Sequence, residues 1–190
     1  MTTIYFIRHA QPDNSVKDDK NRPLTEKGMA DCSLVTKFLN DKQIDIVLSS
    51  PYKRAVDTIS SFANDANLTI TTIEDFREMK VDVTHMKNWE ETFRSKWENF
   101  SYSLPDSESI SEVQKRNIAA FHKVLAEHKD KNIVIGTHGM ALSSIINYYD
   151  PSYGFEDFRA MVLITPWVVK MVFDGDKFVE MEKIDLFRIG

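Results

Sequence analysis

Three short motifs combine histidine or arginine with small residues, and each directly follows an apolar run. They are Arg8-His9-Ala10, Ser49-Ser50-Pro51-Tyr52-Lys53-Arg54 and Thr137-His138-Gly139. Two histidines and two arginines at one place suit a doubly charged anion, because the guanidinium fork matches phosphate oxygens. Helix N-termini after His9, Pro51 and His138 would add backbone N–H donors. The motifs together predict a phosphate site, although each alone is typical of a surface turn or a helix start.

The apolar runs are expected to form the strands that position these motifs. Continuous apolar runs are typical of strands buried on both faces of a parallel sheet. The four runs are Thr3–Ile7, Ile44–Leu48, Ile70–Ile73 and Ile133–Ile135. Helical patterns between them are predicted to start at Thr25, near Pro51, and at Ser109, which forms a capping box with Glu112. Ligands bind beyond the carboxyl ends of such strands, so we expect the three motifs to meet there.

The C-terminal part of the chain is predicted to add further strands. Apolar runs occur at Met161–Ile164, Val168–Phe173 and Phe178–Glu182. Asp174-Gly175-Asp176 joins the last two, and an Asp-Gly pair between such runs favours a hairpin. The expected fold is therefore α/β, a three-layer sandwich with a mainly parallel central sheet flanked by helices and an antiparallel edge hairpin near the C-terminus.

Length and composition limit the class of protein. The chain has 190 residues, 42% of them hydrophobic and 11% aromatic, which indicates one folded domain over residues 1–190 and excludes disorder. A net charge of −5 with interspersed signs argues against nucleic-acid binding. Cys32 is the single cysteine, so no internal disulfide forms, and no Cys/His spacing suits a metal. Without a leader pattern or a membrane-length apolar stretch, we expect a soluble, cytoplasmic protein.

In combination, the motifs resemble the histidine phosphatase superfamily, also called the phosphoglycerate mutase-like proteins. The resemblance covers residues 4 to about 146 and is specific as a set, whereas each piece alone is weak. The matching pieces are Ile7-Arg8-His9-Ala10-Gln11, Leu24-Thr25-Glu26-Lys27-Gly28, Ser49-Ser50-Pro51 with Arg54, Ala55 and Thr58, and Gly136-Thr137-His138-Gly139. A weaker string, Ser107-Glu108-Ser109 with Arg116, resembles the family's Gly-Glu-Ser segment with serine in place of its glycine.

The resemblance implies phosphoryl transfer through a phosphohistidine on His9, without a cofactor or a metal. Arg8, Arg54 and His138 would hold the phosphoryl oxygens during the transfer. Elementary electrostatics agree with these roles, because nearby cations disfavour protonation of a histidine and keep it nucleophilic. Positioned donors also stabilise the charge that develops during in-line attack.

A carboxyl group is also needed, first to protonate the leaving alkoxide and then to activate water. The family places this residue after the third strand, where Glu78 is the best match and Glu74 and Asp82 are alternatives. The family's following Gly-x-Trp-Glu-Gly pattern is missing from this chain. Four residues are expected to contact the substrate: Gln11, Asn14, Ser15 and Gly139. Many family members carry an asparagine six residues beyond the nucleophile, where this chain has Ser15 preceded by Asn14.

Four aromatic residues recur at helical spacing between the two histidine motifs: Trp89, Phe93, Trp97 and Phe100. They indicate either the buried stripe of an amphipathic helix or part of a helical lid-like segment around 79–108 that shapes the substrate pocket. Both interpretations stay open at this point. His85, His122 and His128 lie outside the motifs and are interpreted as surface or packing residues.

Three functions are compatible with the motifs. The first is a phosphomonoester hydrolase acting on a small phosphorylated metabolite. The second is a phosphoglycerate mutase-type isomerase, and the third is a non-catalytic protein that binds phosphorylated ligands. Hydrolysis is favoured because family mutases are generally longer and carry glutamate where this chain has Gln11. We expect no nucleic-acid or membrane partner, and the sequence leaves the substrate and the oligomeric state open.

Overall fold

A six-stranded sheet forms the centre of the computed structural model, which describes residues 1–188. Its strands are β1 (Thr2–Arg8), β2 (Ile46–Ser49), β3 (Ile70–Thr72), β4 (Asn132–Thr137), β5 (Trp167–Asp174) and β6 (Lys177–Ile184). Their spatial order is β3-β2-β4-β1-β5-β6. The first four pair in parallel, whereas β5 runs antiparallel to both β1 and β6. The predicted parallel sheet with an antiparallel hairpin at its edge is confirmed.

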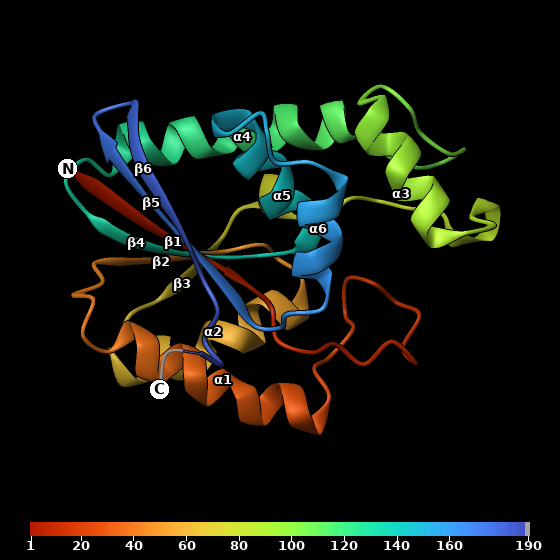
Figure 1. Cartoon of the computed structure of the whole chain (residues 1–190). Helices are drawn as coiled ribbons and strands as arrows, with labels where there is room; N and C mark the ends of the chain where they lie inside the picture. The colour runs from red at the N-terminus through yellow and green to blue at the C-terminus, as the bar shows by residue number, and fades with distance from the viewer. Residues whose placement is uncertain (189–190) are drawn as a thin grey trace.

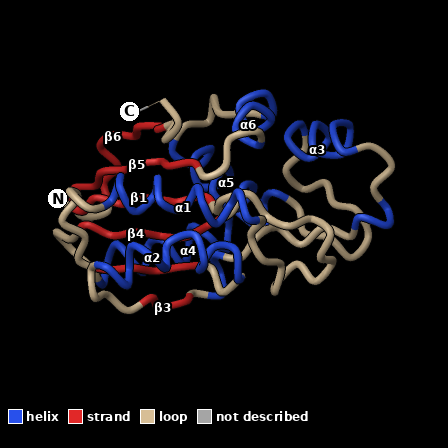
Figure 2. The backbone as a smooth tube through the Cα atoms, turned by 90° about the horizontal axis from the view of Figure 1, so that it is seen from below, coloured by secondary structure: helices blue, strands red, loops and turns tan. Residues whose placement is uncertain are grey.

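Helices cover both faces of this sheet and give the expected three layers. Helices α1 (Glu26–Leu39) and α2 (Lys53–Asp65) cover one face, and α4 (Ile110–Glu127) and α5 (Gly139–Tyr149) cover the other (Figure 1). Two helices lie beyond the carboxyl ends of the parallel strands, namely α3 (Trp89–Glu98) and α6 (Phe155–Val162) (Figure 2). Two 3-10 turns, η1 (Glu74–Phe76) and η2 (Val83–His85), precede α3.

Alternation along the strands builds an apolar core on each face of the sheet. In β1, Ile4 and Phe6 belong to the core beneath α4 and α5, whereas Tyr5 and Ile7 belong to the core beneath α1 and α2. Successive strand residues point to opposite faces, so a strand covered on both sides must be apolar throughout. Polar side chains therefore begin where the strand ends, which places Arg8 and His9 at the edge of the sheet.

Local capping signals form as the sequence predicts. Thr25 begins α1 by accepting the N–H of Gly28 on its side chain, and Ser109 begins α4 in a capping box with Glu112. Gly175, in the turn between β5 and β6, has a φ of 63°, a conformation that glycine adopts without strain. These three predictions of element boundaries are confirmed.

The prediction of a helix after His9 is wrong. The chain forms no helix until α1, because its backbone groups bond to distant segments instead of to the next turn. The N–H of Ala10 donates to Thr58 Oγ1 at 2.9 Å, and the N–H of Thr25 donates to the carbonyl of Gln11 at 3.0 Å. No helix N-terminus therefore supplies backbone donors directly after His9.

The prediction of a strand at Met161–Ile164 is also wrong, because this run contains the end of α6. Phe155, Phe158 and Met161 are buried at a spacing of three residues, which is the period of a helix, whereas Leu163 is 86% exposed. A run of four apolar residues fits either element, and here the buried face of the preceding helix decides.

No helix among residues 1–188 combines the length and the apolar character that a bilayer crossing requires. The predicted domain of residues 1–190 ends with two residues, 189 and 190, that lie outside the described part of the chain.

Candidate active site

The sheet brings the three sequence motifs to one edge. In the parallel register Arg8 lies beside Thr137, and Ser49 lies beside Gly136, so the residues that follow these strands emerge together. The rings of His9 and His138 are 5.2 Å apart between centroids and meet edge to face. A cavity of about 710 Å³ opens here, and His9, Arg54 and Glu78 line it. Strand order thus assembles residues that are far apart in the chain.

His9 is held as a neutral imidazole with one free ring nitrogen. Its Nδ1 lies 2.7 Å from the carbonyl oxygen of Ala10, which only accepts hydrogen bonds, so Nδ1 carries the proton. Burial, followed by the charges of Arg54 and Arg8, lowers the pKa of His9 well below its ordinary value. The remaining nitrogen, Nε2, therefore keeps its lone pair at neutral pH.

Arg54 supplies positive charge to the cavity wall. Its side chain is buried at the start of α2, its Nη1 donates to the backbone carbonyl of Asp19, and it lies 3.2 Å from Asp19 Oδ1. The guanidinium also lies 5.2 Å from the ring centroid of Tyr52. These contacts fix the guanidinium plane beside His9, which suits two-pronged binding of an oxyanion.

Arg8 has a structural contact on one side and a free donor on the other. Its Nη1 donates to the carbonyl oxygens of Met161 and Ile164 at 2.7 and 2.9 Å, which fixes the end of α6 against the sheet. Its Nε is buried and has no hydrogen-bond partner in the part of the chain that the structure describes. Burial lowers the pKa of Arg8 to about 10, so the guanidinium stays charged at neutral pH.

His138 is completely buried behind the cavity wall. Its Nε2 lies 2.7 Å from Ser50 Oγ, and its ring meets that of Tyr52 edge to face at 5.2 Å. Burial and then the charge of Arg54 lower the pKa of His138 well below its ordinary value, as for His9. Its Nδ1 is buried without a partner among residues 1–188. Two buried orphaned nitrogens, this one and Arg8 Nε, thus lie beside His9.

Glu78 is the one of the three candidate carboxylates that lines the cavity. Its Oε1 accepts the N–H groups of Met79 and Ala141 at 2.7 and 3.0 Å, and its Oε2 accepts that of Met140 at 3.1 Å. The carboxylate therefore caps the N-terminus of α5, where backbone donors and the helix dipole favour it. Glu74 is exposed, and Asp82 instead caps η2 through the N–H of Thr84.

A half-buried ion pair holds the loop that carries Glu78. Arg116 donates through Nη2 to the carbonyl of Glu78 at 3.1 Å and through Nη1 to the carbonyl of Arg77 at 2.8 Å. Its Nε pairs with Glu108 Oε1 at 2.9 Å, and Glu108 Oε2 accepts the N–H of Lys80. The weak string around Glu108 thus positions the loop rather than reaching into the cavity.

The structure divides the four residues expected at the substrate. Asn14 lines the main cavity, and Gly139 lines a smaller one of about 180 Å³, where a Cβ would lie 3.5 Å from Arg8 Nε. Gln11 Oε1 instead accepts a hydrogen bond from Thr25, and Ser15 Oγ donates to Asp13. Neither Gln11 nor Ser15 lines the main cavity, because the folded loop satisfies both side chains internally.

Several further residues line the cavity without a role predicted from their motifs. Tyr52 contacts both Arg54 and His138. Its position inside the second motif, two residues before Arg54, is the sequence signal that could have identified it. The loop before α1 contributes three more lining residues, Lys17, Asp19 and Arg22. Its mixed charges follow no periodic pattern that would have indicated their place at the cavity. Arg22 pairs with Asp19 at 2.8 Å, so an ion pair holds this loop at the rim of the cavity.

The aromatic stripe has two parts. Trp97 is buried and packs against Tyr153 and Phe158, with ring centroids 5.9 and 6.0 Å away. Phe93 and Trp89, one and two turns earlier, line both the main cavity and the smaller one. The stripe is therefore core at its C-terminal end and cavity wall at its N-terminal end.

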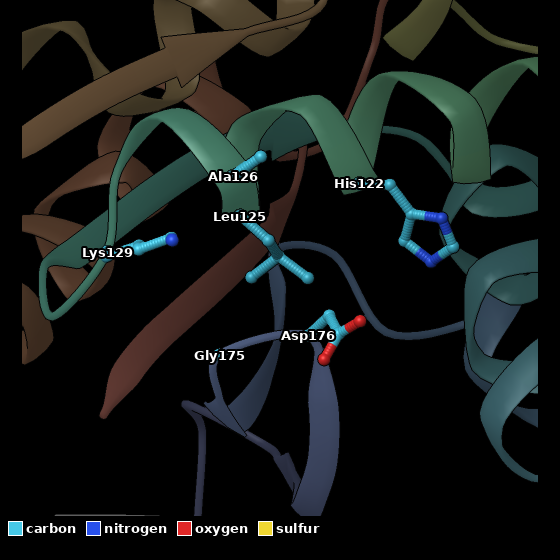
Figure 3. Close-up of a pocket in the computed structure, with 6 residues that line it drawn as sticks. All are labelled: His122, Leu125, Ala126, Lys129, Gly175 and Asp176. Carbon is cyan, nitrogen blue, oxygen red and sulfur yellow. The ribbon is translucent and has the colours of Figure 1, made fainter.

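Another cavity, of about 360 Å³, lies between α4 and the turn of the β5–β6 hairpin (Figure 3). Because β5 is antiparallel to β1, this turn lies at the opposite edge of the sheet from His9. His122 lines it, together with Leu125, Ala126, Lys129, Gly175 and Asp176. Within residues 1–188, no group of three or more His, Cys, Asp or Glu side chains is arranged to hold a metal ion.

Comparisons with known proteins agree with this geometry. The chain is 27% identical over 158 residues to a putative phosphoserine phosphatase 2 from Hydrogenobacter thermophilus, covering 77% of each. It is 25% identical over 159 residues to a probable phosphoglycerate mutase GpmB from Yersinia pestis, covering 77% of this chain and 74% of the relative.

Similarity also extends to solved structures. A mutant phosphoserine phosphatase from Entamoeba histolytica, in complex with phosphoserine, superposes over 100% of both chains with a TM-score of 0.80 at 18% identity, which shows the same fold. The model of the histidine phosphatase superfamily, branch 1, matches residues 4–184, which is nearly the whole chain. The chain is therefore a member of the histidine phosphatase superfamily, branch 1.

Proposed function

We propose that this chain is a phosphomonoester hydrolase that works through a phosphohistidine on His9 and acts on a small phosphorylated metabolite. Family membership and relatives named as phosphatases support this activity. The observation that carries the proposal is the state of His9: a neutral ring, with Nδ1–H bound to a carbonyl and Nε2 free beside two arginines. A carboxyl group, Glu78, lines the same cavity.

In the first step the lone pair of His9 Nε2 forms a bond to phosphorus. Glu78 enters this step as the carboxylic acid. The bond from phosphorus to the leaving-group oxygen breaks, and Glu78 donates its proton to that oxygen and becomes a carboxylate. Arg54, the free Nε of Arg8 and His138 bind the phosphoryl oxygens, and each such donor contributes about 3 kcal/mol in comparable oxyanion sites. The proton stays on Nδ1, hydrogen-bonded to the Ala10 carbonyl, throughout the step, so the ring carries the positive charge of the phosphohistidine.

In the second step water attacks phosphorus from the side that the leaving group has vacated. Glu78 takes the proton of this water, the N–P bond breaks, and its electron pair returns to Nε2. Inorganic phosphate leaves, and both residues regain their starting protonation states. Splitting one difficult displacement into two easier ones is the benefit of covalent catalysis.

A phosphoglycerate mutase is the second candidate, because one relative carries that name. Hydrolysis fits the cavity better, since its rim residues Asn14, Lys17 and Lys80 are exposed and water has access to the phosphoenzyme. At the position where mutases carry glutamate, Gln11 is neutral and bonded to Thr25.

The test is phosphate release from p-nitrophenyl phosphate, phosphoserine and 3-phosphoglycerate, in buffer with and without EDTA. We expect phosphate release that EDTA leaves unchanged, and an acid-labile phosphoenzyme after rapid quenching. Conversion of 3-phosphoglycerate to its 2-isomer faster than phosphate release would favour the mutase. Activity that EDTA removes and zinc or magnesium restores would overturn the metal-independent mechanism.

A further inference from the structure

The main cavity has an apolar wall on the side of Glu78. We use the term apolar wall for six side chains that line this cavity: Met79, Val81, Val83, Met86, Trp89 and Phe93. Four of them, Met79, Val81, Trp89 and Phe93, also line the smaller cavity of about 180 Å³ behind Glu78, together with Phe158 and Val162. Glu78 therefore lies between two hollows that share one hydrophobic boundary.

Aromatic packing supports the apolar wall from behind. The ring of Trp89 stacks on Phe158, with centroids 5.8 Å apart and planes at 19°, and lies 4.9 Å from Phe93. Trp89 is nevertheless 37% exposed, and Val83, on the neighbouring turn, is 65% exposed. Apolar surface that is left exposed beside a reaction centre and held by a packed core is typical of a binding surface.

The opposite side of the cavity is charged. Arg54 lies there beside His9, and the loop residues Lys17, Asp19 and Arg22 form its rim. The cavity thus has a cationic side, which suits the phosphoryl group, and a mainly apolar side, where Lys80 adds one charged side chain at the rim. Glu78 lies at the boundary between them. A leaving-group oxygen that receives a proton from Glu78 must lie beside that carboxyl group, so the carbon atoms attached to it reach the apolar wall.

We propose that the substrate of this enzyme carries an apolar leaving group, an alkyl or aryl alcohol, rather than a polyhydroxylated or doubly charged one. The inference rests on the proposed function, because it takes His9 as the nucleophile and Glu78 as the proton donor. It goes further by assigning the leaving group to the apolar wall. Polar leaving groups bury their hydroxyl or charged groups against side chains that offer no hydrogen bonds, which costs binding energy.

The n-alkyl phosphates from ethyl to octyl phosphate test this assignment. Their alkoxides have nearly constant basicity, so the chemical step stays the same while apolar area grows. Each buried methylene raises kcat/KM by up to about fourfold, a value set by the transfer free energy of a CH₂ group. We expect kcat/KM to rise along the series until the wall is covered, and to exceed that for glycerol phosphate and phosphoserine. A flat or falling series, or a preference for phosphoserine over butyl phosphate, overturns the inference.

Variants of the wall make the test specific. The measured quantity is the ratio of kcat/KM for octyl phosphate to kcat/KM for ethyl phosphate. We expect Trp89→Ala to lower this ratio by about tenfold and Val83→Ser by about threefold, because replacing the tryptophan removes more apolar area. Val83 is exposed, so its variant keeps the core intact even where Trp89→Ala loosens it. Tyr148→Ala is the matched control, because this aromatic ring is 48% exposed and lines neither cavity. An unchanged ratio in both wall variants contradicts the assignment.

Failure of this inference and failure of the proposed function give different results. If ethyl phosphate is hydrolysed through a phosphoenzyme but the rate does not depend on chain length, the assignment of an apolar leaving group is wrong and the proposed hydrolase activity stands. If no phosphomonoester is hydrolysed and no phosphoenzyme forms, both the proposed hydrolase activity and this inference are wrong.

Discussion

The two cavities at opposite edges of the sheet each contain a histidine, and the two histidines differ in almost every physical respect. His9 is buried, its Nδ1 is bound to a backbone carbonyl, and burial followed by the charges of two arginines lowers its pKa. His122 is exposed, and its Nε2 lies 3.3 Å from the hydroxyl of Tyr149. Its cavity has one lysine and one aspartate, charges of both signs.

This difference shows what the carboxyl edge of a parallel sheet contributes. Three strands end side by side there, and each delivers a polar motif to the same point from a core that is otherwise apolar. Burial then strengthens every charge–charge interaction, so that two arginines keep the histidine neutral. A histidine in a hollow is not by itself a nucleophile. It becomes one through its fixed tautomer and its buried cationic neighbours.

The largest expected effect contrasts the two histidines directly. His9→Ala should reduce turnover on the order of 10³-fold or more and abolish the phosphoenzyme, because the attacking nitrogen is removed. His122→Ala should keep kcat/KM within about twofold of the wild type, as expected for a surface change. Steady-state kinetics and quenched phosphoenzyme measurements check both variants. Retention of a tenth of the activity by His9→Ala would remove His9 from the nucleophile role.

Glu78→Gln tests the second group of the same cavity. We expect hydrolysis of alkyl phosphates to slow by roughly 100-fold, because a poor leaving group needs a proton. Phosphorylation by p-nitrophenyl phosphate should slow much less, and phosphoenzyme should accumulate, since water has lost its base. Glu74→Gln is the matched control on the exposed side of the same loop. Equal small losses on both substrate types in Glu78→Gln, with no burst, would point to Glu74 or Asp82.

Arg116 tests whether the loop must be held for Glu78 to act. Arg116→Gln removes the hydrogen bond to the Glu78 carbonyl and the pairing with Glu108. We expect kcat for alkyl phosphates to fall about tenfold through misplacement of the carboxyl group. The loss for p-nitrophenyl phosphate should be smaller, a split that mere loss of stability does not produce. Arg159→Gln, which breaks a surface pair with Glu90, is the control. Equal losses on both substrates would leave Arg116 a purely structural residue.

The smallest effect concerns stability against pH. The pKa values of His9 and His138 are lowered in the folded state, so below pH of about 6.5 the unfolded chain binds protons that the folded chain does not. The free energy of unfolding therefore falls as the pH decreases through this range, by up to about 1.4 kcal/mol per pH unit for each histidine. Urea unfolding at pH 7.5 and 5.5 should show a weaker pH dependence in His138→Gln, with His122→Gln as the control. The same pH dependence in wild type and His138→Gln would show that His138 is not buried as a neutral ring.

The sequence predicted most of the elements, and the place of the motifs, because their signals are local. Apolar runs, a capping threonine and an Asp-Gly turn each act within a few residues, and the structure contains all three. Parallel strands then bring their carboxyl ends together as a matter of topology. The convergence of His9, Arg54 and His138 followed from this rule, before any contact between them was known.

Tertiary structure decided what local patterns left open. Glu78, rather than Glu74 or Asp82, lines the cavity because Arg116 and the N-terminus of α5 hold its loop, and neither contact leaves a periodic signal near residue 78. Gln11 and Ser15 lie away from the cavity because their own loop offers closer partners.

The aromatic stripe shows the same limit. Its spacing alone predicted a helix, but which of its rings belong to the core and which to the cavity depends on where α6 packs against α3. What the sequence determined by itself is which segments form strands, most of the helices between them, and the cationic motifs that follow the strands, because these depend on residues that are neighbours in the chain. The direction of each loop side chain was decided by partners that only folding brings close.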